Sequence, residues 1–121
     1  MTTPTFPTLM VAPAQVRRGA GVLATVGEVI ARLGQRPLLI GGDRTLAIAA
    51  PFLKPALAGL TASSASYGND CSETALSQLQ AAAQAHAADV VIGVGGGKAL
   101  DAAKLIAQQR QLPVITVPTS A

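Results

Sequence analysis

The segment Val90-Val-Ile-Gly-Val-Gly-Gly-Gly-Lys-Ala-Leu-Asp-Ala-Ala-Lys104 decides how this chain folds. An apolar strand pattern ends in three consecutive glycines, and a helix pattern begins directly after them. Glycine allows the backbone to approach a ligand closely, and a helix N-terminus presents unpaired N–H groups with a partial positive charge. Together these features predict a strand–turn–helix unit that holds a phosphate group, and therefore a nucleotide-binding protein.

Strand and helix patterns alternate along the rest of the chain. Strands are predicted at 9–11, 15–18, 37–40, 61–67, 89–94 and 113–117. Helices are predicted at 21–33, 45–49, 52–60, 72–87 and 98–110. We expect Gly34 to end the first helix and Pro51 to interrupt the second. Helices between continuous apolar strands indicate an α/β fold, a Rossmann-like parallel sheet with helices on both faces. The expected domain is 9–121, preceded by a flexible segment, 1–8.

Composition excludes several classes of protein. Half of the 121 residues are hydrophobic but only 2% are aromatic, so Ala, Val, Leu and Ile must form the core. The net charge is +3, and the basic residues are scattered without interleaved aromatics, which argues against nucleic acid. No apolar run reaches the roughly 18 residues that a membrane helix needs. We therefore expect no nucleic-acid partner and no membrane partner.

The N-terminus and the single cysteine favour a cytoplasmic protein. Residues 1–13 contain three prolines and no charged residue, so they do not form a secretory signal. Cys71 is the only cysteine, which excludes an intrachain disulfide and is compatible with a reducing compartment. Cys71 is either a small packed residue or a reactive thiol.

The glycine turn matches neither of two familiar phosphate-binding motifs. A G-x-G-x-x-G motif starting at Gly93 would need glycine where Lys98 stands. A P-loop would need glycine at Ile92 and a hydroxyl residue at Ala99. We nevertheless expect the N–H groups of Gly95, Gly96 and Gly97 to bind a pyrophosphate, because a merely tight turn would not need three glycines. Lys98 either adds its charge to this site or stays in solvent.

Asp43 follows the strand at 37–40 and is the candidate for binding a ribose. Its carboxylate could accept both hydroxyl groups of an adenosine ribose and would repel a 2′-phosphate, which favours NAD over NADP. The alternative is that Asp43 caps the N-terminus of the next helix.

Hydroxyl side chains at the end of the last strand are further candidates. Thr116, Thr119 and Ser120 lie where an open parallel sheet binds its ligands, although simple turn formation competes for the last two. Asp101 and Lys104 stand three residues apart on a helix, where an ion pair is at least as well supported as a catalytic role. His86 is expected to be a solvated residue near a helix C-terminus rather than a ligand.

The segments 93–104 and 112–119, with G-V-G-G-G-K-A-L-D-A-A-K and L-P-V-I-T-V-P-T, resemble the iron-containing (type III) alcohol dehydrogenase family. Within that family the resemblance is to the glycerol dehydrogenase branch, and it covers the chain from about residue 9 to its end. Four shorter pieces agree with it: Ala12-Pro13, Gly19–Leu23, Gly42-Asp43 and Asp70–Glu73.

The resemblance implies a fold similar to dehydroquinate synthase, with an N-terminal NAD-binding α/β domain and a C-terminal helical domain. One Asp and two His of the helical domain hold zinc or iron, and an alcohol or polyol transfers hydride to NAD. Carried over by position, Asp43 binds the adenosine ribose. Gly96, Gly97 and Lys98 lie at the pyrophosphate, and Thr119 contacts the nicotinamide half.

Family members are much longer than this chain. We therefore expect an N-terminal half without catalytic or metal-binding residues, inactive alone, that binds NAD weakly. An uncovered docking surface would favour a homo-oligomer. Two alternatives stay open: the corresponding half of a dehydroquinate synthase-like or glycerol-1-phosphate dehydrogenase-like enzyme, and a stand-alone nucleotide-binding module.

Overall fold

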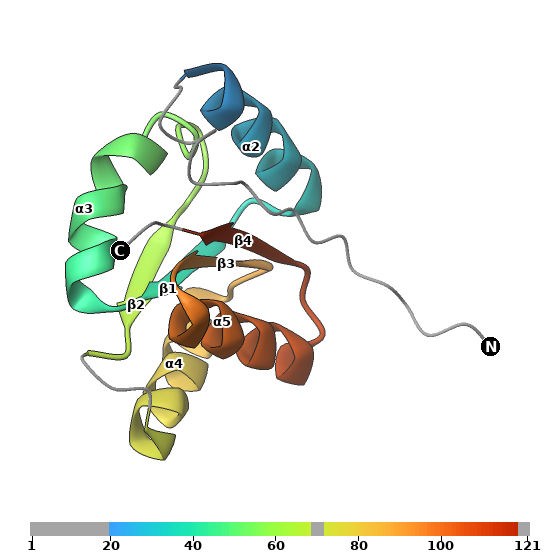
Figure 1. The fold of residues 1–121 in the computed structure, drawn as a ribbon. Coiled ribbons are helices and arrows are strands. Elements are labelled where there is room, and N and C mark those ends of the chain that lie inside the picture. The colour runs from blue at the N-terminus through green and yellow to red at the C-terminus, as the bar shows by residue number, and fades with distance from the viewer. Residues whose placement is uncertain (1–19, 69–71, 119–121) are drawn as a thin grey trace.

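The computed structural model describes residues 20–68 and 72–118 (Figure 1). The elements are α2 (Ala20–Leu33), β1 (Pro37–Gly41), α3 (Asp43–Leu53), β2 (Ser63–Ser66), α4 (Glu73–His86), β3 (Val90–Gly95), α5 (Gly97–Arg110) and β4 (Val114–Pro118). The predicted flexible segment 1–8, the predicted strands 9–11 and 15–18, and Cys71 lie outside the described residues.

The described strands form one parallel sheet in the order β2-β1-β3-β4. Leu39 of β1 is paired with Ile92 of β3, and Ile92 with Ile115 of β4. The prediction of a parallel sheet is therefore confirmed.

Two hydrophobic clusters cover the two faces of the sheet. One lies under α2 and α3 and includes Ile30, Leu39, Leu53, Val90, Ile92, Val94, Ile115 and Val117. The other lies under α4 and α5 and includes Leu38, Ile40, Leu79, Ala83, Val91, Ala103, Ile106 and Val114. Successive residues of a strand point to opposite faces, so the continuous apolar run of β3 contributes to both clusters. Helices lie on both faces, as predicted (Figure 1).

Small residues bring α5 close to the sheet. A Cβ atom on Gly93 would lie only 2.6 Å from the Cβ atom of Ala103. Ala102, Ala103 and Ala107 of α5 are buried and belong to the cluster under α4 and α5. The aromatic-poor composition therefore produces a thin, tightly packed layer between α5 and β3.

The segment around Pro51 differs from the prediction. α3 runs without interruption from Asp43 to Leu53 and contains Pro51 in its last turn. The proline removes one backbone bond to Ala47, which is exposed, so that carbonyl can bond water instead. The predicted continuation to 60 is wrong.

The bonding becomes irregular after α3, where Pro55 has no N–H group to donate, although the Leu57 N–H still donates to the Leu53 carbonyl at 3.1 Å. Shorter bonds follow, with the Ala58 N–H donating to the Pro55 carbonyl at 3.3 Å and the Leu60 N–H to the Leu57 carbonyl at 3.0 Å. Gly59, at φ +83°, lies between them. These bonds span three residues, as in a tighter 3₁₀-type turn.

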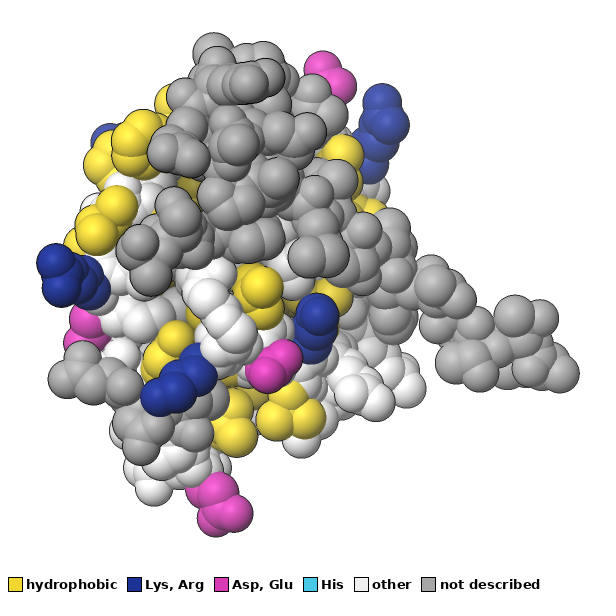
Figure 2. All heavy atoms as spheres, in the orientation of Figure 1, with side chains coloured by type: hydrophobic (Ala, Val, Ile, Leu, Met, Phe, Trp, Pro, Cys, Tyr) yellow, Lys and Arg dark blue, Asp and Glu magenta, His cyan; other side chains and the backbone are white. Residues whose placement is uncertain are grey.

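Charged side chains are spread over the surface drawn in Figure 2. The lysines and arginines visible there lie apart, among acidic and apolar side chains. In the described ranges, no helix is long and apolar enough to cross a membrane.

Candidate functional site

The strand order reverses between β1 and β3, and the space outside the carboxyl ends of these two strands is called the crevice below. From β1 the chain continues to β2 on one side, whereas β3 lies on the other side of β1. The order therefore reverses between β1 and β3. In open parallel sheets, ligands bind outside the carboxyl ends at such a reversal. The two strand ends are in close contact, because a Cβ atom on Gly41 would lie 2.7 Å from the Val94 carbonyl oxygen. The glycine turn and Asp43 therefore lie at the same edge of the sheet, where the carboxyl ends of β1 and β3 are.

Gly95 makes the sharp turn between β3 and α5. Its φ is +136°, a conformation that side chains rarely adopt. A Cβ atom there would also lie 3.0 Å from the Ala99 Cβ atom and 3.4 Å from the Thr45 Cγ2 atom. Both the backbone conformation and the neighbouring atoms therefore require glycine.

Gly96 and Gly97 border open space at the start of α5. Both are exposed, and a Cβ atom on either would meet no atom within 4 Å. Gly96 is the N-cap of α5 and provides no side-chain acceptor for the first turn. The bare backbone leaves room for an anion against these N–H groups.

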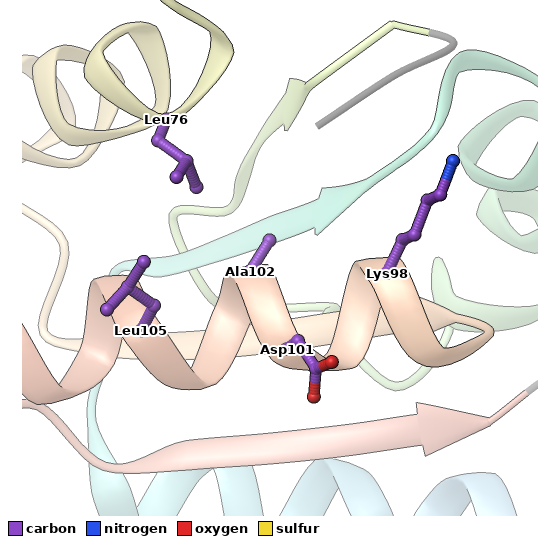
Figure 3. A pocket seen from close by; sticks show the side chains of 5 residues that line it. All are labelled: Leu76, Lys98, Asp101, Ala102 and Leu105. Carbon is purple, nitrogen blue, oxygen red and sulfur yellow. The ribbon is translucent and has the colours of Figure 1, made fainter. Parts of the chain in front are cut away.

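Lys98 lies in the first turn of α5 and lines a hollow of about 260 Å³. The other lining residues are Leu76, Asp101, Ala102 and Leu105, so α4 and α5 form the hollow (Figure 3). Figure 3 shows the Lys98 and Asp101 side chains pointing in different directions from α5. Asp101 and Lys104 are both exposed.

Asp43 is the first residue of α3 rather than its cap. Gly42 occupies the N-cap position, and no side chain caps this helix. The capping alternative is therefore wrong. The Asp43 carboxylate is exposed in the first turn, where a negative charge is favourable, and it lies at the carboxyl edge of β1.

Thr116 requires a correction. It is paired with Gly93 inside the sheet and is fully buried, with 0% of its surface exposed. A cofactor in the crevice could not reach its side chain. The other two predicted hydroxyl residues, Thr119 and Ser120, lie outside the described residues.

His86 belongs to a structural network at the opposite, amino-terminal edge of the sheet. Its Nε2 atom lies 2.9 Å from the Thr61 carbonyl oxygen, and its own carbonyl accepts a bond from Arg36 Nε at 2.8 Å. The Asp89 carboxylate accepts the N–H groups of Gln35 at 2.9 Å and Arg36 at 2.8 Å. His86 is thus half-buried and bonded, not merely solvated as predicted. Nothing in the spacing of these residues predicted the network.

The described residues contain no group of three His, Cys, Asp or Glu side chains that could hold a metal ion. A zinc or iron ion therefore does not fit the side chains of residues 20–68 and 72–118. The groups that lie at the crevice are suited to a nucleotide. They are the backbone amides at the start of α5, which no side chain caps, the exposed glycines Gly96 and Gly97, and the exposed Asp43 carboxylate.

Known proteins similar to this chain are oxidoreductases. An uncharacterized oxidoreductase from Synechocystis sp. is 42% identical over 93% of the chain, and a glycerol dehydrogenase from Escherichia coli is 32% identical over 90%. A glycerol-1-phosphate dehydrogenase from Methanothrix thermoacetophila is 35% identical over 90%. The chain spans 29%, 30% and 32% of these proteins, respectively.

Solved structures share the fold. A glycerol dehydrogenase from Schizosaccharomyces pombe matches 92% of the chain with a TM-score of 0.68 at 24% identity, and the match covers 27% of that protein. A maleylacetate reductase from Agrobacterium tumefaciens matches 98% with a TM-score of 0.71 at 26% identity, over 33% of its length. The family model for iron-containing alcohol dehydrogenases matches residues 13–121. The chain therefore belongs to the iron-containing alcohol dehydrogenase family.

Proposed function

We propose that this chain is the NAD-binding part of a metal-dependent dehydrogenase that transfers hydride from an alcohol or polyol to NAD. The observation that carries the proposal is the position of the glycine turn. It lies at the reversal of strand order, beside the strand end that carries Asp43. The dehydrogenase relatives support the reaction class.

In this proposal each part of the crevice binds a different part of the cofactor. Gly95 makes the turn, and the N–H groups of Gly96 and Gly97 hold the pyrophosphate, with Lys98 adding a positive charge. Asp43 accepts the hydroxyl groups of the adenosine ribose. A 2′-phosphate there would place two negative groups side by side, so NAD is preferred to NADP.

Thr119 and Ser120 extend the proposed site toward the nicotinamide. Their place in the sequence, directly after β4, supports this part of the proposal, since β4 adjoins β3 in the sheet. Because Thr116 is buried, it has no part in the proposed site.

The proposed catalytic metal, zinc or iron, would be held by residues outside the described part of this chain. When bound, such a metal polarises the alcohol oxygen and lowers its pKa. The proposal thus assigns cofactor binding to a domain at 9–121 and the acid chemistry to a different part of a longer, cytoplasmic protein.

A homo-oligomer is also proposed, and light scattering of the chain tests it.

A glycerol phosphate is the second candidate for the substrate class. The 35% identity to a glycerol-1-phosphate dehydrogenase supports a glycerol phosphate as well as the 32% identity to a glycerol dehydrogenase supports a free polyol. Both candidates share the cofactor site proposed here.

Calorimetric titration of the full 121-residue chain with NAD, NADP and ATP tests the cofactor assignment. We expect NAD to bind, with NADP weaker. Binding of ATP without binding of NAD would remove the dehydrogenase proposal and favour a different nucleotide-binding module.

A further inference from the structure

Tyr67 lies beside the proposed ribose site, although its place in the sequence did not mark it as a candidate. β2 is paired with β1 so that Ser66 stands opposite Gly41. Tyr67 follows directly, and its N–H group donates to the Gly41 carbonyl at 3.2 Å. Tyr67 is therefore level with Gly42, one residue before Asp43, at the carboxyl edge of the sheet.

The Tyr67 ring extends over the end of β1. A Cβ atom on Gly42 would lie 3.7 Å from the Tyr67 hydroxyl oxygen and 3.8 Å from its Cε1 atom. Tyr67 also packs beside Ala65 against the cluster under α4 and α5, and it remains half-buried. The core thus holds one part of the ring while another part reaches the strand end at which the crevice opens.

Few aromatic residues are available to contact a base. The chain contains two phenylalanines, one tyrosine and no tryptophan. In the described ranges the aromatic residues are Phe52 and Tyr67. Phe52 lies near the C-terminal end of α3, whereas Asp43 begins that helix, so of these two described residues Tyr67 is the one that adjoins the ribose position.

We propose that the Tyr67 ring stacks against the adenine base of the cofactor. This inference rests on the proposed function, because it takes the ribose to be bound at Asp43. The adenine base is attached to the ribose and therefore lies next to it. On the β2 side of Asp43, the neighbouring apolar surface is the Tyr67 ring. Aromatic rings stack on nucleobases through their faces and need no particular hydrogen-bonding pattern.

Intrinsic fluorescence tests the stacking directly. Because Tyr67 is the only tyrosine and tryptophan is absent, tyrosine emission of the full chain comes from this ring. We expect AMP and ADP-ribose to quench this emission saturably, and nicotinamide mononucleotide to leave it unchanged. Free N-acetyltyrosinamide, titrated in parallel, corrects for absorption by the nucleotide.

Two substitutions separate the ring face from the hydroxyl group. Tyr67→Leu keeps an apolar side chain in the core but removes the ring, and we expect AMP affinity measured by calorimetry to fall about tenfold. Tyr67→Phe keeps the ring and should retain the affinity. Phe52→Leu, at the far end of α3, is the matched control and should change nothing. Far-ultraviolet circular dichroism checks that each variant is folded.

The possible outcomes distinguish this inference from the function on which it rests. If NAD and AMP bind but the emission does not change, or if a folded Tyr67→Leu variant binds AMP normally, the stacking is refuted and the cofactor assignment stands. Equal losses for Tyr67→Phe and Tyr67→Leu would also refute it, since the hydroxyl group would then carry the effect. If no adenine nucleotide binds the unaltered chain, both proposals fail.

Discussion

Thr45, in the first turn of α3, lies against Gly95, the turning residue between β3 and α5: a Cβ atom on Gly95 would be 3.4 Å from the Thr45 Cγ2 atom. The first turn of α3 therefore lies beside the end of β3, at the carboxyl edge of the sheet. This proximity brings the start of α3 and the glycine turn to the same side of the crevice.

Gly95→Ala should destabilise the fold. The substitution forces a side chain into a backbone conformation at φ +136° and brings its Cβ atom within 3.0 Å of the Ala99 Cβ atom. We expect a loss of about 1–3 kcal/mol in the free energy of unfolding. Urea denaturation followed by circular dichroism measures it. Unchanged stability would show that the turn is not constrained as described.

Gly96→Ala separates binding from stability. Gly96 has an extended backbone, with φ −88° and ψ −161°, and open space around it, so alanine fits without strain. The added methyl group would nevertheless occupy space proposed for the pyrophosphate. We expect the unfolding midpoint to fall only slightly, because alanine is a poorer N-cap than glycine, while calorimetry on the folded variant shows clearly weaker binding of NAD. Full NAD affinity in this variant would argue that the phosphates lie elsewhere.

Asp43→Asn should reduce the preference for NAD over NADP. Replacing the carboxylate weakens its bonds to the ribose, with an expected loss of about 1.5–3 kcal/mol for NAD. The binding of NADP should change less, because the repulsion of its 2′-phosphate also disappears. Glu28→Gln, an exposed acidic residue on α2, removes the same charge away from the site and serves as the control. An equal NADP-to-NAD affinity ratio in both variants would exclude Asp43 from the ribose site.

Asp89→Asn should destabilise the opposite edge of the sheet. The carboxylate accepts two backbone N–H groups, those of Gln35 and Arg36, and an amide would turn a donor toward one of them. We expect a loss of about 1–3 kcal/mol in unfolding free energy, with no change in NAD binding per folded molecule. Denaturation and calorimetry on the same preparation check both parts. A stable variant would mean that these bonds contribute nothing measurable.

The sequence predicted the elements near the glycine turn well, because each has a strong local cause. The glycines at 95–97 end β3 and begin α5, and both faces of β3 carry apolar side chains. The prediction that Pro51 interrupts the helix was wrong. A proline in the last turn costs little here, because the carbonyl group that loses its bond belongs to an exposed residue.

The site depended on information that local patterns do not contain. Strand order decides which strand ends are neighbours. Thr116 shares a face of β4 with Val114, which packs in the cluster under α4 and α5, so its burial depends on the helix layer over the sheet. The position of Tyr67 also depends on the β1–β2 register. The one available signal was an aromatic residue at the end of the predicted strand 61–67, directly before Gly68.

Amide NMR of the ¹⁵N-labelled chain, titrated with ADP-ribose, shows where the pyrophosphate binds. If the glycine turn binds the pyrophosphate, the amide signals of Gly96 and Gly97 should shift saturably and more than those at the amino-terminal edge, such as Gln35. Saturable binding that leaves the Gly96 and Gly97 amide signals unmoved would show that the glycine turn does not hold the pyrophosphate.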